Sequence, residues 1–182
     1  MADRGLKSQI CNFCLKSGIL CSNCEEKVRK GEITEVDINV AKTLLELEKT
    51  YPPLQKITLR KAYQSGETLI VIVNRGDVPH LAGSDGKIMR AISQSVGKKV
   101  KVLETGGSDR KFIEDLFSPL NIVTINTIWL PDGSIESRLV LSGSPRRIPV
   151  DVEALRKLAK EIRGINLRVE FEKTLDRKMS WT

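Results

Sequence analysis

The chain has 182 residues, of which 40% are hydrophobic and 29% charged, and this composition is typical of a folded globular protein. A chain of this length can form one large domain or two small ones. The net charge of +7 and pI ≈ 9.3 favour a polyanionic partner, although a solvated basic surface gives the same balance. Aromatic residues make up 4% of the chain, which argues against a platform that stacks bases on aromatic side chains.

The sequence shows no sign of a membrane segment or a secretion signal. No apolar run approaches the ~20 residues that span a bilayer. The first residues, Met1 to Lys7, lack the apolar core of a signal peptide. We therefore expect a cytoplasmic protein that does not contact membranes.

All four cysteines of the chain lie in its first 31 residues: Cys11, Cys14, Cys21 and Cys24. The spacing is C-x2-C-x6-C-x2-C, and a short hairpin between the pairs would create a tetrahedral thiolate site that suits structural Zn²⁺. The segment has too few apolar residues for its own core, so bound metal would hold it together. We predict a four-cysteine zinc ribbon over residues 1–31, ending in a short helix from Glu25 to Lys30.

Other uses of the cysteines stay open. Structural disulfides would suit a source that lives at very high temperature. A redox dithiol is disfavoured because no strand–helix–strand pattern surrounds either pair, and catalytic zinc because four cysteine ligands leave no open position. The segment could also dock a protein, cap the next helix, or contact nucleic acid through its cations: Lys16, Lys27, Arg29 and Lys30.

Residues 32–104 read as one folded unit. Thr34 can cap a helix from about Glu35 to Lys49, in which apolar residues recur at helical spacing. Gly97 ends a second long helix. After the first helix the pattern predicts strand, strand, short helix, helix and strand: residues 57–63, 68–73, 78–82, 86–96 and 98–103.

The two later helices are joined by Gly83-Ser84-Asp85-Gly86. Glycine lets the backbone turn tightly and lie close to a phosphate, and the free N–H groups of the next helix point at such an anion. A packing turn that merely uses glycine is the alternative, and the flanking elements decide between the two. Positive charge lies nearby in sequence: Lys87, Arg90, Lys98 and Lys99.

Residues 105–174 repeat the pattern after a short linker. Ser108 can cap the first helix, and Pro131-Asp132-Gly133-Ser134 is a strong turn between two strands. The predicted elements are helix, strand, strand, helix and strand: residues 108–117, 122–130, 135–141, 151–163 and 165–171. We expect residues 175–182 to form a tail.

This second unit lacks a Gly-x-x-Gly loop. By register, residues 149–152 occupy the corresponding place, and their proline and β-branched residues do not allow the close backbone approach that glycine allows. Arg146 and Arg147 lie just before this segment and could contact phosphate. A solvated loop explains these two residues equally well.

The stretch from Leu81 to Val102 resembles the nucleic-acid-binding signature of KH domains, and residues 32–104 have the element order of a type II KH domain. The resemblance implies that the Gly83–Gly86 loop clamps about four nucleotides of single-stranded RNA. Asp85 departs from the family, whose loops often carry a basic residue there. Its carboxylate would repel phosphate, or turn aside and cap the next helix. The implied RNA-binding residues are Gly83, Ser84, Asp85, Gly86, Lys87, Arg90, Lys98 and Lys99.

The join from Lys111 to Leu120 resembles the region between the two KH domains of NusA, where a Phe-rich helix runs into Ser-Pro. The resemblance to an archaeal NusA-like protein covers roughly residues 35–172. It implies an α+β chain: a zinc ribbon over residues 1–31, then type II KH domains (αββααβ) over 32–104 and 105–174, the second degenerate. It also implies a non-catalytic RNA-binding factor of transcription elongation or termination, with RNA polymerase as a partner.

Three other functions are weighed against that one. A ribosome-associated factor fits because type II KH domains also occur in small-subunit proteins. A protein-interaction module with weak or lost RNA binding is favoured by Asp85 and by the missing second loop. An enzyme is disfavoured because the sequence shows no nucleophile–base pair, no metal site with an open position and no P-loop.

Overall fold

The computed structural model describes residues 5–148 and 150–172, which form a mixed α+β fold. The chain divides into two compact units, residues 1–107 and 108–182, and each is described by itself. The predicted tail over residues 175–182 lies outside the described residues. Within the described ranges, no helix is long and apolar enough to cross a membrane.

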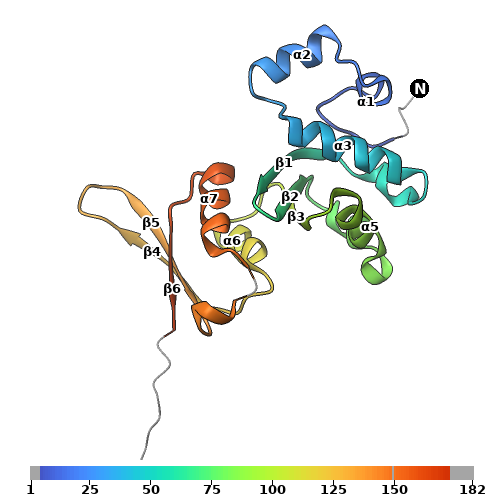
Figure 1. Ribbon diagram of the computed structural model, residues 1–182. Coiled ribbons are helices and arrows are strands. Elements are labelled where there is room, and N and C mark those ends of the chain that lie inside the picture. The colour runs from blue at the N-terminus through green and yellow to red at the C-terminus, as the bar shows by residue number, and fades with distance from the viewer. Residues whose placement is uncertain (1–4, 149, 173–182) are drawn as a thin grey trace, which may run out of the picture. The chain divides into compact units, whose positions relative to one another are not determined.

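The first unit is built on a three-stranded sheet (Figure 1). Its strands are β1 (Leu59–Ser65), β2 (Thr68–Val73) and β3 (Lys99–Glu104), in the order β1-β2-β3. The middle strand β2 runs antiparallel to β1 and parallel to β3. Residues 69–73 of β2 are all buried, as the near-continuous apolar run predicts for a central strand.

Helices cover one face of this sheet. They are α3 (Glu35–Glu48), α4 (Val78–Ala82) and α5 (Lys87–Val96), and a single 3-10 turn, η2 (Ser84–Gly86), separates the last two. A second 3-10 turn, η1 (Pro52–Lys56), follows α3. Alternate residues of β2 and the apolar stripes of the helices share one core, which includes Val40, Leu44, Leu69, Val71, Val73, Leu81, Ile88 and Ile92.

The cysteine-bearing segment packs into this same core. It contributes five buried side chains: Leu6, Ile10, Cys14, Leu15 and Cys24. The expected hairpin between the cysteine pairs is not found. The structure has two short helices instead, α1 (Asn12–Ser17) and α2 (Ser22–Arg29), and Gly18 ends α1 with φ +75°. Each Cys-x-x-Cys motif forms the first turn of a helix, and this turn brings the two sulfurs of the motif together.

The second unit has the same sheet plan. Its elements are α6 (Asp109–Phe117), β4 (Ile122–Trp129), β5 (Ile135–Leu141), η3 (Pro145–Arg147), α7 (Val152–Arg163) and β6 (Leu167–Phe171). The sheet order is β4-β5-β6, with β5 antiparallel to β4 and parallel to β6. Ser108 caps α6 as expected, since its side chain accepts an N–H bond at the start of the helix, and the structure shows that the side chain of Asp151 does the same at the start of α7.

Candidate functional site

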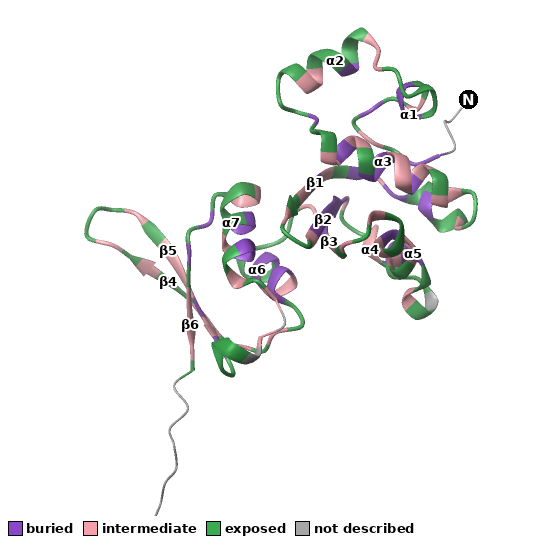
Figure 2. Ribbon diagram, viewed as in Figure 1, coloured by how far each residue is buried: buried purple, intermediate pink, exposed green. Residues whose placement is uncertain are grey.

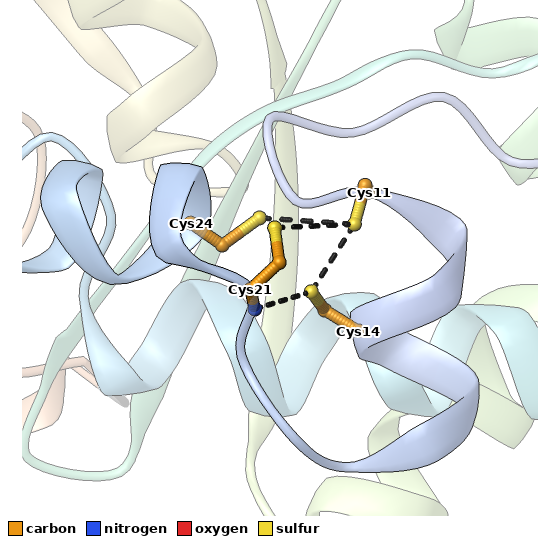
Figure 3. A group of neighbouring side chains, drawn as sticks. All are labelled: Cys11, Cys14, Cys21 and Cys24. Carbon is orange, nitrogen blue, oxygen red and sulfur yellow. Dashed lines mark hydrogen bonds between the residues drawn. The ribbon is translucent and has the colours of Figure 1, made fainter.

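The four cysteine sulfurs gather at one point (Figure 3). All four lie within 4.8 Å of one another. The Sγ of Cys11 is 3.1 Å from that of Cys14, 4.0 Å from that of Cys21 and 3.9 Å from that of Cys24. A tetrahedral site with metal–sulfur bonds of about 2.3 Å separates its sulfurs by about 3.8 Å. The cluster could therefore hold a metal ion.

Helix starts position these sulfurs. Cys11 and Cys21 are the N-cap residues of α1 and α2, and Cys14 and Cys24 lie one turn inside those helices. Cys14 and Cys24 are buried, Cys21 is half-buried and Cys11 is exposed. A bound ion would thus lie at the margin of the core. The thiols are free, and even the 3.1 Å pair is far longer than the ~2.05 Å of a disulfide.

Hydrogen bonds within the cluster divide the thiols into two kinds. A bond to the Sγ of Cys11, together with burial, raises the pKa of Cys14 to about 12. Hydrogen bonds with the backbone N–H of Cys24 and with the thiols of Cys14 and Cys24 lower the pKa of Cys21 to about 7. The backbone N–H of Cys14 lowers the pKa of Cys11, and burial raises that of Cys24. The pKa values of Cys11 and Cys21 are thus lowered, and those of Cys14 and Cys24 are raised, so a metal would have to deprotonate the second pair.

Contacts outside the cysteine pairs fix this segment in place. The N–H of Leu6 donates to Oε2 of Glu48 at 3.0 Å, and Nζ of Lys27 donates to the carbonyl of Gln9 at 3.0 Å. Sequence reasoning did not single out Glu48, which lies 42 residues from Leu6. No local pattern signals such a contact, because it depends on the tertiary packing of α3.

The Gly83–Gly86 loop has the backbone that its glycines predict. Gly83 has φ +50° and ψ 177°, a region that is essentially restricted to glycine. Asp85 and Gly86 are left-handed, with φ +73° and +63°. A Cβ at Gly86 would meet no described atom within 4 Å, so the space above it is open. The loop can therefore approach a ligand through its backbone.

The amino end of α5 is left without a side-chain cap from any described residue. The carboxylate of Asp85 points to solvent with 74% of the side chain exposed, and its Oδ2 lies 3.9 Å from Nζ of Lys87. Asp85 therefore does not cap the helix, which was one of its two expected roles. The first-turn N–H groups of α5 remain available to an anion.

The predicted cations fall into two places. Lys87 and Arg90 are exposed and three residues apart on α5, so they share a helix face beside the loop. Lys98 and Lys99 follow the other end of α5, about 15 Å away for a ten-residue helix. There, Nζ of Lys98 donates to the carbonyl of Gly66 at 3.4 Å. One ligand can meet both pairs only by running along α5.

The second unit has no comparable loop among its described residues. The 3-10 turn η3 and residues 148–151 connect β5 to α7, and Asp151 caps α7 through Ala154 N–H at 3.1 Å. Pro149 lies outside the described residues. Because Asp151 occupies the amino end of α7, this helix start is less available to an anion than that of α5.

Comparison with known proteins gives a limited relationship. No protein-family model matches the chain. A segment of 64 residues is 31% identical to the "Probable transcription termination protein NusA" of Methanocaldococcus jannaschii, covering 35% of this chain and 33% of that protein. The match supports a NusA-like relationship and spans about a third of that relative's length. A solved structure, "Crystal structure of APE1850", aligns with 71% of this chain and 95% of its own at 16% identity and a TM-score of 0.45.

Proposed function

We propose that this protein is a non-catalytic, NusA-like factor that binds single-stranded RNA through the Gly83–Gly86 loop and the start of α5. The phosphates lie on the loop backbone and the first-turn N–H groups, and the bases lie along α5 toward β2. Lys87 and Arg90 add a salt-dependent electrostatic attraction. In this proposal the two units are type II KH domains, and the second has lost its loop.

The observation that carries the proposal is the backbone of the loop. Three residues with positive φ, Gly83, Asp85 and Gly86, precede an uncapped ten-residue helix. At the two glycines, this combination lets a phosphate approach the backbone N–H groups closely, since glycine has no side chain. The helix–strand–strand–helix–helix–strand order of residues 35–104 supports the same proposal. So does the sequence identity, over 64 residues, with a protein named "Probable transcription termination protein NusA".

The cysteine cluster has a structural part in this proposal. Four thiolates are the ligand set that tetrahedral Zn²⁺ prefers, and they leave no open position for catalysis. Cys14 and Cys24 belong to the core that also holds Ile88 and Ile92 of α5. Zn²⁺ bound there would stabilise the unit that presents the loop.

The test is fluorescence anisotropy with a short single-stranded RNA over a salt series. Ser84→Asp makes the loop Gly-Asp-Asp-Gly and should abolish binding while the protein stays folded. The matched control is Ser142→Asp, which adds the same charge at an exposed position of the second unit and should bind as the parent does. Equal binding by both variants would show that the loop is not the site.

A second candidate function is a protein-interaction module, which the exposed carboxylate of Asp85 favours. A carboxylate at the loop repels phosphate. If the parent protein binds no RNA but retains a partner protein at high salt, this function replaces the first.

The setting of the RNA factor is tested separately. The tagged protein is incubated with purified RNA polymerase and with small ribosomal subunits from the same source. Retention of the polymerase supports the transcription role, whereas retention of the ribosomal subunit alone supports a ribosome-associated factor.

A further inference from the structure

The outer edge of β4 has no part in the proposed function. In the sheet order β4-β5-β6, β4 is paired on one side only among the described strands. Its eight residues contain no charged side chain. The other three edge strands, β1, β3 and β6, each contain charged residues, such as Arg60, Lys101 and Arg168. Charge on an edge strand discourages pairing with another chain, and β4 lacks this protection.

Exposed apolar side chains concentrate on the same hairpin. The described chain exposes five large hydrophobic residues, and three of them are Val123, Trp129 and Ile135, with Trp129 exposed by 74%. Trp129 and Ile135 are opposite each other at the turn end of β4 and β5, where Figure 2 shows little burial. By alternation, Trp129 lies on the sheet face that carries the buried Leu139.

A hollow lies at the opposite end of the same strand. It has a volume of about 330 Å³ between α6 and the start of β4. Four of its lining residues are apolar, Pro119, Leu120, Ile122 and Val123, and four are polar or charged, Arg110, Glu114, Ser118 and Thr124. Since α6 forms one wall, the hollow opens on the face of the sheet toward which Trp129 projects. The edge of β4 thus carries an exposed indole at one end and, at the other, a recess with a partly apolar lining.

We propose that two copies of this protein associate through β4, with the strands antiparallel and centred on Asn126. In this register, residues 124–128 of one copy pair with residues 128–124 of the second. The pairing of β4 is irregular between Ile122 and Thr124, and Trp129 of each copy comes opposite this irregularity, at Val123 of the second copy, and enters the hollow there. The result is a continuous six-stranded sheet with closed two-fold symmetry. The strands meet without like-charge repulsion because β4 has no charged side chain.

A second copy is the occupant that these observations fit. Both halves of the contact, the indole and the hollow, are present on one strand, so two antiparallel copies of that strand bring each indole to the hollow of the other. An isologous interface requires this self-complementarity, whereas a strand of another protein would use only one half. In this register, residues whose side chains point to the same face of the sheet lie opposite each other. The helix-covered faces of the two copies therefore stay on one side of the combined sheet.

The test is sedimentation velocity of the full chain over a wide concentration range. The parent should form a dimer. Asn126→Lys places two like charges opposite each other and should weaken the dimer by about tenfold or more. The control is Gln64→Lys, which puts the same charge on an exposed position of the edge strand β1 and should leave the dimer unchanged. A parent that stays monomeric at every concentration overturns the proposal, as does an Asn126→Lys dimer as strong as the control's.

A second variant decides the matter if Asn126→Lys fails to fold by circular dichroism. Trp129→Ala removes an exposed side chain and should weaken the dimer without loss of folding. In a Trp181→Phe background, where Trp129 is the one remaining tryptophan, its emission should shift to shorter wavelength as the protein concentration rises. An unshifted spectrum throughout dimer formation, or an unweakened Trp129→Ala dimer, overturns the proposed contact.

Discussion

The backbone N–H of Cys21 donates a hydrogen bond to Sγ of Cys14 at 3.1 Å. This bond joins the two Cys-x-x-Cys helices through the atom that would bind a metal. A sulfur that accepts an N–H bond carries negative charge more easily, and yet the pKa of Cys14 is raised to about 12, because its bond to Cys11 and its burial outweigh that effect. Near neutral pH Cys14 therefore stays protonated unless a metal ion displaces its proton.

Metal binding should release protons. Near pH 7.5 the raised pKa values of Cys14 and Cys24 keep both thiols protonated, whereas Cys21, with a pKa of about 7, is largely ionised. Binding of Zn²⁺ should thus release at least two protons, so affinity should fall as the pH falls, and more steeply below about 7, where Cys21 is protonated as well. Calorimetry in buffers of different ionisation enthalpy measures the number, and no proton release would contradict thiolate ligation.

Removal of the metal should destabilise the first unit. Cys14 and Cys24 lie within its core, so loss of the ion releases α1 and α2 from the packed helices. Cys14→Ser should abolish stoichiometric zinc and lower the melting temperature by about 5 °C or more. Ser22→Ala, an exposed neighbour that is not a ligand, serves as the control and should keep both. A Cys14→Ser variant that melts like the parent would show that the site is not structural.

Asp37 should be the most costly single truncation at the start of α3. Its buried carboxylate accepts bonds from Ala62 N–H at 2.6 Å and Thr34 N–H at 2.7 Å, and lies 3.1 Å from Nζ of Lys61. Asp37→Ala leaves these buried donors unsatisfied and should lower the free energy of unfolding by about 3 kcal/mol. Urea denaturation measures the free energy of unfolding, with Glu35→Ala at an exposed position as the control. An equal loss of stability in both variants would refute the special role of Asp37.

Asp85→Asn should strengthen RNA binding. Asparagine tolerates the left-handed backbone at this position as aspartate does, so the loop keeps its shape while the charge is removed. Loss of about 1 kcal/mol of repulsion corresponds to a dissociation constant about fivefold lower at low salt. The gain should shrink as salt is added. The control is Glu161→Gln on the exposed side of α7, and the same gain there would mean that only net charge matters.

Local signals made much of the fold predictable. Thr34, Ser108 and Asp151 each cap a helix that begins where the sequence places it, since a cap acts on the N–H groups two or three residues away. Strand β2 follows the predicted range, residues 68–73. Thr34-x-x-Asp37 is also a capping-box pattern, but the bond from Ala62 to Asp37 was beyond prediction because it joins residues 25 apart.

The candidate sites were less predictable than the elements. The spacing of the cysteines predicted their convergence, but not the helices α1 and α2 or the shared core with Leu6 and Ile10, which depend on tertiary packing. Lys98 and Lys99 were grouped with the loop because they are near it in sequence. The intervening helix α5 places them at its other end, where they adjoin Gly66 and Glu67.

The most direct test is to map the contact of a short single-stranded RNA on isotopically labelled protein by the shifts of its backbone amide resonances. The proposed function predicts that the largest shifts fall in residues 83–90, the loop and first turn of α5, and that they saturate together. Smaller shifts should continue along α5 toward Lys98. Shifts confined to residues 11–30 or to the second unit, with residues 83–90 unmoved, would contradict the loop as the RNA site.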